Sequence, residues 1–131
     1  MNKAENCPCG SEKNFTECCA TLLSGDAKAK TAEQLMRSRY SAYVKENESY
    51  LRNTWHPDTR PESIEFEPAI KWTRLRIKNT DKGGVKDEQG TVEFIATYKS
   101  NGRAFQLHEV SRFVRNNGDW VYLDGETGNT K

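Results

Sequence analysis

The spacing of apolar positions divides most of the chain into a helical part and a strand part, which meet near residue 70. Thr31 and Gln34 fit a capping box, so the sequence predicts a helix that begins with Thr31 as its N-cap. Asn47 is predicted to end this helix and to cap a short second one, which Pro57 stops. The expected buried positions follow helical spacing: Leu35, Met36, Tyr40, Tyr43 and Val44 in the first helix, and Tyr50, Leu51 and Trp55 in the second.

From Ile70 onward, apolar and polar residues alternate, which is typical of strands with one buried face. Asn101-Gly102 and Asn117-Gly118 predict two tight hairpins, and the polar segment 81–90 predicts a looser one. One face of these strands is expected to carry Leu75, Ile77, Val92, Phe94, Ala96, Tyr98, Phe105, Leu107, Glu109, Ser111, Phe113, Trp120, Tyr122 and Asp124. Two helices followed by an antiparallel meander predict an α+β fold, and residues 20–30 are predicted to be a linker before it.

Composition and charge narrow the class of protein. A chain of 131 residues forms one ordinary domain plus a small appendage. Charged residues make up 30% and the formal net charge is +1, so no overall charge attracts the chain to nucleic acid or to an anionic membrane. No apolar run reaches the length of a membrane span, and the first residues lack the apolar core of a signal peptide. We therefore expect a cytoplasmic protein.

All four cysteines of the chain fall within 13 consecutive residues: Cys7, Cys9, Cys18 and Cys19. The segment Cys7–Cys19 is called the knuckle below. Disulfides suit secreted domains, whereas clustered thiolates in a reducing cytosol suit a metal site. The cluster therefore predicts one structural Zn²⁺ in a tetrahedral site, with iron as the alternative that the same ligands accept. Gly10 can take a positive φ, and Ser11 is predicted to cap a helical turn that continues to Asn14.

The run C-P-C-G-S-E-K-N-F-T-E-C-C resembles the SEC-C motif, which is found at the C-terminus of the SecA translocase and in other small bacterial proteins. In that family the pattern C-x-C-x8-C-[HC] binds zinc, which implies the four cysteines as metal ligands, with Cys19 standing where many members have His. Residues 35–43, 54–57 and 108–125 resemble the YchJ-like family, whose members join such a motif to a nuclear-transport-factor-2-like domain. This resemblance implies a cone of N-terminal helices against a curved antiparallel sheet, also called the cystatin-like fold. The implied division is a knuckle and linker over residues 1–25 and the cone domain over residues 26–131.

The predicted charge of the knuckle indicates which class of partner it binds. Over residues 1–25, two lysines against three glutamates give about −1, and four thiolates around one Zn²⁺ add a further −2. SEC-C motifs often carry several lysines between the cysteine pairs, where this chain has Glu12, Asn14 and Glu17. Nucleic acid binding needs a basic surface, so we expect a protein partner rather than RNA. The SEC-C resemblance implies a partner associated with protein export or translation.

A second candidate site lies on the inner face of the predicted sheet, where Glu109 and Ser111 interrupt an apolar surface. A buried carboxylate is costly unless it is paired, so we expect either an ion pair with Arg39 or a hydrogen bond from Tyr40 or Tyr43. The favoured interpretation is a structural link of this kind. The alternative is a small-molecule pocket in which Glu109 acts as a general base. Its predicted lining residues are Arg39, Tyr43, His56, Glu109, Ser111, Trp120 and Asp124.

The sequence therefore predicts a zinc-binding cytosolic protein whose knuckle is a protein-interaction module, with a small-ligand pocket in the cone and a homodimer contact through the open sheet face. Four protein thiolates leave no open coordination position, so no catalytic residue is assigned at the metal. The alternative is a small-molecule enzyme of the isomerase, dehydratase or hydrolase type that uses the cone pocket. Only fold analogy supports that alternative, and fold does not determine function. A pocket that holds Glu109 beside a second titratable group would favour the enzyme, whereas a filled cone would oppose it.

Overall fold

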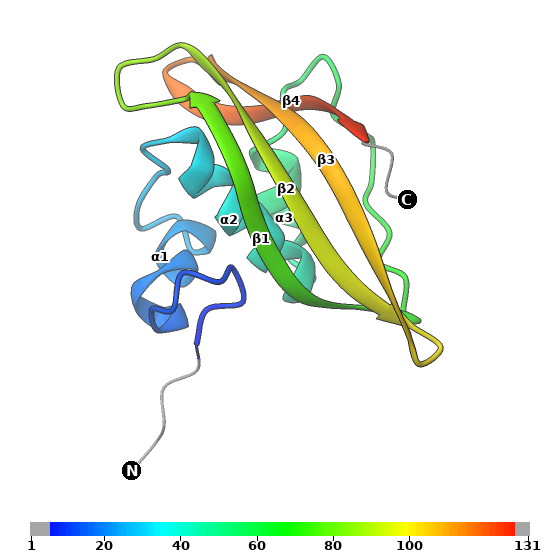
Figure 1. Cartoon of the computed structure of the whole chain (residues 1–131). Helices are drawn as coiled ribbons and strands as arrows, with labels where there is room; N and C mark the ends of the chain where they lie inside the picture. The colour runs from blue at the N-terminus through cyan, green and yellow to red at the C-terminus, as the bar shows by residue number, and fades with distance from the viewer. Residues whose placement is uncertain (1–5, 128–131) are drawn as a thin grey trace.

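The computed structural model describes residues 6–127 and folds them into short helices followed by one four-stranded sheet. The helices are a 3-10 helix, η1 (Phe15–Glu17), and three α-helices, α1 (Cys19–Leu23), α2 (Ala32–Val44) and α3 (Glu48–Asn53). The strands are β1 (Ile70–Lys82), β2 (Gln89–Ser100), β3 (Arg103–Asn116) and β4 (Asp119–Thr127). They form an antiparallel sheet in the order β1-β2-β3-β4; α2 lies against one of its faces, and α3 packs beside α2 (Figure 1). The predicted α+β fold, a curved sheet over N-terminal helices, is confirmed.

Both predicted helix caps are present. The hydroxyl of Thr31 accepts a hydrogen bond from the backbone N–H of Gln34 at 3.1 Å, and the side chain of Gln34 accepts from the N–H of Lys30 at 2.7 Å. At the start of α3, the side chain of Asn47 accepts from the N–H of Tyr50 at 3.0 Å. These bonds satisfy amides that a helix start leaves without partners, so they fix where α2 and α3 begin.

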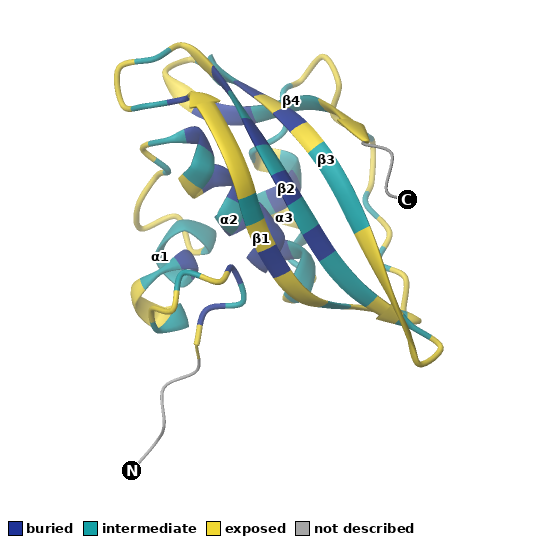
Figure 2. Cartoon of the chain, viewed as in Figure 1, coloured by how far each residue is buried: buried dark blue, intermediate teal, exposed yellow. Residues whose placement is uncertain are grey.

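The main core lies between α2 and the inner face of the sheet. Its buried members are Ala32, Leu35, Met36 and Tyr40 of α2, with Leu75, Val92, Phe94, Ala96, Phe113 and Trp120 of the sheet. Buried and less buried residues alternate along β2 in Figure 2, as the alternating sequence pattern predicts. The predicted hairpins at Asn101-Gly102 and Asn117-Gly118 connect β2 to β3 and β3 to β4, and all four turn residues have positive φ, as a type I′ turn requires.

One irregularity in the sheet changes which side chains face inward. Arg112 pairs with Asp124 across β3 and β4, whereas Phe113 pairs with Tyr122, so Leu123 is an extra residue in β4. This bulge turns Asp124 to the outer face, where one carboxylate oxygen accepts a hydrogen bond from Nε of Arg112 at 2.6 Å. The prediction that Asp124 shares the inner face with Tyr122 is therefore wrong.

The helical turn within the knuckle lies later than predicted. It spans Phe15–Glu17 rather than Ser11–Asn14, and Glu12 has a left-handed φ of 69° that interrupts any helix there. The hydroxyl of Ser11 accepts from the backbone N–H of Lys13 at 3.2 Å, which closes a local turn instead of capping a helix.

The segment predicted to be a linker, residues 20–30, begins with helical structure. Helix α1 (Cys19–Leu23) continues from the second cysteine pair into that range, and Leu23 packs against the cysteine cluster. The division into residues 1–25 and 26–131 stays a prediction, and residues 1–5 and 128–131 of those ranges lie outside the described residues. In the described part of the chain, every helix is too short or too polar to cross a membrane.

Candidate metal centre and cone cavity

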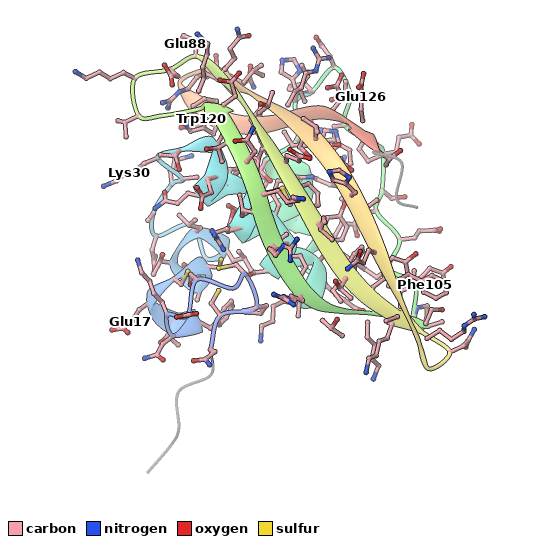
Figure 3. All side chains as sticks on the ribbon, in the orientation of Figure 1. Glu17, Lys30, Glu88, Phe105, Trp120 and Glu126 are labelled. Carbon is pink, nitrogen blue, oxygen red and sulfur yellow. The ribbon has the colours of Figure 1, made fainter. Side chains whose placement is uncertain are left out.

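The four cysteine sulfurs lie together beside α1, where Figure 3 shows sulfur atoms gathered. All four Sγ atoms lie within 4.8 Å of one another, with 3.7 Å between Cys9 and Cys18 and 4.0 Å between Cys18 and Cys19. A tetrahedral ion with Zn–S bonds of about 2.3 Å would place its sulfurs about 3.8 Å apart. The donor set and its spacing therefore fit a tetrahedral metal ion.

A reversal of the chain after the first cysteine pair brings the two pairs together. Gly10 has a φ of 83°, and the N–H of Cys7 donates to the carbonyl of Lys13 at 2.8 Å. A Cβ atom at Gly10 would lie 3.1 Å from the carbonyl oxygen of Leu75. Both the left-handed φ and this close approach favour glycine at that position. The second cysteine pair then follows at the start of α1.

The thiols interact strongly with one another. The hydrogen bond with the Cys19 thiol lowers the pKa of Cys9, and the same contact raises the pKa of Cys19. Burial raises the pKa of Cys18, although the hydroxyl of Ser11 lies 3.2 Å from its sulfur and opposes this effect. Metal ligation requires thiolates, so a bound cation would take the place of the protons that the cluster otherwise shares.

Helix α2 holds the first cysteine pair. Nη1 of Arg37 donates to the carbonyl of Cys9 at 2.6 Å, and the Arg37 Nε donates to Glu33 at 3.0 Å. One helical turn later, the buried hydroxyl of Ser41 lies 3.5 Å from the sulfur of Cys7. These contacts orient the backbone and sulfur of the first pair, in the way that outer-shell groups orient metal ligands.

Folding also changes the charge around the knuckle. Arg37 lies at its base, and the ammonium of Lys45 lies 4.6 Å from the centre of the Phe15 ring. A groove of about 160 Å³ beside the second cysteine pair is lined in part by three lysines: Lys13, Lys28 and Lys30. The surface is therefore of mixed charge, because residues outside 1–25 offset the acidic count that the sequence gives.

A cavity of about 210 Å³ lies between α2 and the inner face of the sheet. Its lining residues are Met36, Arg39, Tyr40, Tyr43, Trp55, Trp72, Phe94, Ala96, Leu107, Glu109, Ser111 and Tyr122. Four of the predicted pocket residues are among them: Arg39, Tyr43, Glu109 and Ser111. The cone therefore contains a cavity, and half of the residues that line it are aromatic.

Arg39 places a buried charge in the wall of this cavity. It is only 4% exposed, and its guanidinium carbon lies 4.9 Å from the centre of the Trp55 ring and 4.8 Å from that of Tyr122. Nη1 of Arg39 donates to the carbonyl of Leu51 and to the hydroxyl of Thr54, both at 2.8 Å. Burial lowers the pKa of Arg39 to about 10, so the group still carries its charge at neutral pH.

Glu109 does not form the ion pair with Arg39 that the sequence predicts. Its Oε2 accepts hydrogen bonds from the hydroxyl of Ser111 at 2.6 Å and from that of Tyr122 at 3.1 Å. Across residues 6–127, no carboxylate lies within salt-bridge distance of Arg39. A partly buried tyrosine–glutamate link is present, but its donor is Tyr122 rather than a tyrosine of α2. Burial raises the pKa of Tyr122, so its hydroxyl keeps the proton that it donates.

Comparison with known proteins assigns both parts of the chain. The family described as the YchJ middle nuclear-transport-factor-2-like domain matches residues 31–125, and the SEC-C motif matches residues 5–21. The chain belongs to the YchJ-like family. Together, the SEC-C match and the four clustered sulfurs indicate a metal site in this YchJ-like chain.

Relatives and solved structures agree with this assignment. The chain is 48% identical over 120 residues to a UPF0225 protein of Streptomyces coelicolor, with 92% of this chain and 94% of the relative covered. A UPF0225 protein of Chromobacterium violaceum is 46% identical over 123 residues, which cover 91% and 90% of the two chains. The solution structure of a SEC-C motif containing protein from Rhodopseudomonas palustris has a TM-score of 0.83 at 32% identity, covering 95% of this chain and 100% of that one. A crystal structure of a SEC-C motif containing protein from Psychrobacter arcticus, with a TM-score of 0.77 at 24% identity over 97% and 85% of the chains, shares the fold.

Three predicted pocket residues of the YchJ-like domain lie away from the cavity. The ring nitrogen Nδ1 of His56 accepts from the backbone N–H of Asp58 at 3.0 Å. Trp120 packs in the main core and donates its indole N–H to the carbonyl of Lys30 at 3.2 Å. Asp124 lies on the outer face because of the bulge in β4. The predicted pocket is corrected accordingly, since none of these three lines the cavity.

Five aromatic residues of the cavity wall are missing from the predicted pocket: Tyr40, Trp55, Trp72, Phe94 and Tyr122. Trp55 and Tyr122 were expected to be buried, so alternation and helical spacing did place them inward without assigning them to a cavity. Trp72 reaches the same face as Leu75 only because an extra residue lies between Trp72 and Arg74 in β1. A bulge of this kind leaves no mark in a regular two-residue period.

Gly125 explains how a carboxylate fits next to β4 in this YchJ-like chain. A Cβ atom at Gly125 would overlap the carboxylate of Glu109. The glycine therefore leaves the space in which Glu109 reaches the hydroxyls of Ser111 and Tyr122. This requirement links a residue of β3 to a residue of β4, so it can be recognised only once the register of the two strands is known.

Proposed function

We propose that this YchJ-like protein is a cytosolic binding protein in which one structural Zn²⁺ holds the knuckle and the knuckle recognises a partner protein. The observation that carries the proposal is the set of four sulfurs within 4.8 Å of one another. Four protein thiolates complete a tetrahedral shell, and such closed shells are typical of structural zinc. Iron accepts the same ligands and is the alternative metal. The chemistry that the ion supplies is thiolate ligation, which fixes the backbone of the knuckle.

The surface proposed for recognition is the loop between the two cysteine pairs. Glu12, Lys13, Thr16 and Glu17 are exposed on it. The base of the loop is held by the hydrogen bond from Cys7 to the Lys13 carbonyl and by the contact of Arg37 with the first pair. A loop that is ordered before binding loses less conformational entropy on association. The SEC-C resemblance supports a partner in protein export or translation, and the thiolate charge disfavours nucleic acid.

A pull-down from bacterial lysate tests this proposal. The intact protein is compared with the Cys18→Ser, Cys19→Ser double variant, and the metal content of both is measured. We expect the intact protein to carry one metal ion per chain and to capture a partner that the double variant loses. Capture of the same proteins by both forms would contradict the proposal and would indicate that the cone, rather than the knuckle, binds them.

A matched variant separates the recognition surface from the metal site. Glu17→Lys reverses an exposed charge, and Glu17 contributes no sulfur to the cluster. We expect this variant to keep its metal and to capture less of the partner. Nuclease treatment of the lysate should leave capture unchanged, and loss of capture after nuclease would show that RNA carries the contact instead.

Binding of a small molecule in the cone is the second candidate function. The specific observation is an open cavity of about 210 Å³ that holds Arg39 and Glu109, with Tyr122 in contact with both. Glu109 lies beside a second titratable group, Tyr122, so the enzyme alternative of the isomerase, dehydratase or hydrolase type would use the same cavity with Glu109 as base. Glu109→Gln distinguishes the two: a binding protein keeps its affinity within a few-fold, whereas an enzyme loses turnover.

A homodimer through the outer face of the sheet completes the proposal. Val110 lies on that face and is 37% exposed, so it is the position chosen to test the contact. Light scattering across a concentration series measures the mass in solution. We expect a dimer that Val110→Glu dissociates, and a monomer at all concentrations would contradict this part of the proposal.

A further inference from the structure

Arg39 is a cation beside an apolar cavity, and among residues 6–127 three of its N–H groups have no acceptor. Its guanidinium carries five N–H donors, of which the two on Nη1 bind Leu51 and Thr54. Among residues 6–127, the fully buried side-chain nitrogens without a partner are Nε of Arg52 and Nε1 of Trp55. Nε and Nη2 of Arg39 are not in that group, so both nitrogens keep some exposed surface, and Arg39 lines the cavity. A buried charge of this kind is costly until an anion or a polar group meets it.

Glu109 offers a free acceptor in the same cavity. Its Oε2 binds the hydroxyls of Ser111 and Tyr122, whereas within the described residues its Oε1 accepts no hydrogen bond. Tyr122 contacts both charged groups. The guanidinium of Arg39 lies over its ring, and its hydroxyl donates to Glu109. A molecule that lies along Tyr122 therefore meets donors at one end and an acceptor at the other.

The size and walls of the cavity limit what fits between these groups. A dry apolar cavity of about 150 Å³ holds one benzene molecule, and drug-sized ligands occupy roughly 300–1,000 Å³. The volume of about 210 Å³ therefore suits one ring with two small substituents. The rings of Tyr40, Tyr43, Trp55, Trp72 and Phe94 line the space, and flat aromatic walls favour a planar guest.

We propose that the cone cavity binds a small planar carboxylic acid that carries a hydrogen-bond donor at its opposite end. The carboxylate accepts from the free N–H groups of Arg39 in the forked arrangement that guanidinium favours. The donor at the other end binds Oε1 of Glu109, and the ring packs among the aromatic walls. The proposal rests on the small-molecule role proposed for the cone and is independent of the knuckle.

Three commercial probes test the ligand class on the intact, metal-loaded protein at neutral pH: 4-hydroxybenzoate, benzoate and benzamide. NMR of the tryptophan indole N–H groups measures binding. Trp55 is the reporter because its ring covers Arg39, and Trp120 is the internal reference because its N–H already binds Lys30. We expect a saturable shift of the Trp55 signal with 4-hydroxybenzoate, about tenfold tighter binding than benzamide, and benzoate between the two.

Each contrary outcome has a distinct meaning. Benzamide binding as tightly as benzoate would overturn the carboxylate assignment and would leave the cavity as a small-molecule site. The lack of a saturable Trp55 shift with all three probes would overturn the ligand class and the small-molecule role together. Neither result would bear on the function proposed for the knuckle, because the pull-down measures its partner separately.

Two variants locate the probe in the cavity. Arg39→Gln removes the charge, so we expect affinity for benzoate to fall to that for benzamide. Because Arg39 also joins α2 to α3, Glu109→Gln provides a second variant that keeps the hydrogen bonds from Ser111 and Tyr122. In Glu109→Gln we expect benzoate to bind at least as tightly as before, while the preference for 4-hydroxybenzoate shrinks. An unchanged preference would overturn the role of Glu109.

Discussion

The knuckle and the cone cavity both gather polar groups, but the chain assembles them in different ways. The knuckle takes four sulfurs from 13 consecutive residues, so its chemistry is present in the local sequence. The cavity takes its walls from α2, from the segment after α3 and from all four strands, so its chemistry depends on register. The first site therefore depends on local sequence, whereas the second depends on how the sheet packs.

Removal of the metal is expected to have the largest effect, and to unfold the knuckle while the sheet stays folded. The cysteine cluster and the main core are separate clusters of buried residues. Binding of structural zinc contributes roughly 10 kcal/mol or more to the folding of small zinc peptides at pH 7. We expect a chelator to abolish hydrogen-exchange protection in residues 7–19 while β2 and β3 keep theirs. Simultaneous loss in both regions would show that they unfold as one unit.

Arg37→Met is expected to loosen the contact between the two regions. The side chain is 24% exposed and donates to the carbonyl of Cys9 at 2.6 Å. A hydrogen bond from a charged group contributes about 1.5–3 kcal/mol, so we expect a loss of that order in urea unfolding of the metal-bound protein. Glu33→Gln removes only the ion pair within α2 and should cost about 0.5 kcal/mol or less. Equal losses in both variants would contradict the role of Arg37 in holding the knuckle.

Gly125→Ala is expected to disturb the cavity and leave the knuckle unchanged. The added Cβ atom overlaps the Glu109 carboxylate, which must then leave Ser111 and Tyr122. The loss of these hydrogen bonds predicts a destabilisation of about 1–2 kcal/mol in urea unfolding. Gly84→Ala is the matched control, because its Cβ atom would lie 3.4 Å from Asp87, an ordinary contact. If Gly84→Ala lowers the free energy of unfolding as much as Gly125→Ala does, overlap with the Glu109 carboxylate does not explain the loss.

Asp124→Asn should have the smallest effect, since Asp124 lies outside the cavity. The Arg112 guanidinium lowers the pKa of Asp124 in the folded protein. A lowered carboxyl pKa adds stability that is fully present above the unfolded-state pKa and is lost as the pH falls through the folded-state pKa. We expect the variant to be slightly less stable than the parent at neutral pH, and this difference to shrink and vanish as the pH falls through the lowered pKa of Asp124. A large loss would instead place Asp124 in a buried site.

The parts of the molecule that the sequence predicted correctly are those that short-range chemistry determines. Thr31 and Asn47 cap their helices as expected, and the two Asn-Gly pairs form the expected hairpins. Each of these features depends on residues within a few positions of one another. The clustering of the sulfurs follows from the same kind of local information, because the spacing of the cysteines limits how far apart they can lie.

Two of the predictions that were wrong depend on distant segments. The bulge at Leu123 moves Asp124 to the outer face, although the alternating pattern continues through it. Arg39 was expected to pair with Glu109, but the rings of Trp55 and Tyr122 enclose it and hydroxyls satisfy Glu109. Such choices among partners are made by three-dimensional packing, which composition and periodicity do not contain.

X-ray absorption at the metal edge, with metal quantification on the same purified sample, tests the central claim most directly. The account predicts one zinc ion per chain with four sulfur neighbours at about 2.3 Å. Fewer than four sulfur neighbours, an oxygen ligand at the ion, or protein without stoichiometric metal whose cysteines are joined as disulfides would contradict it.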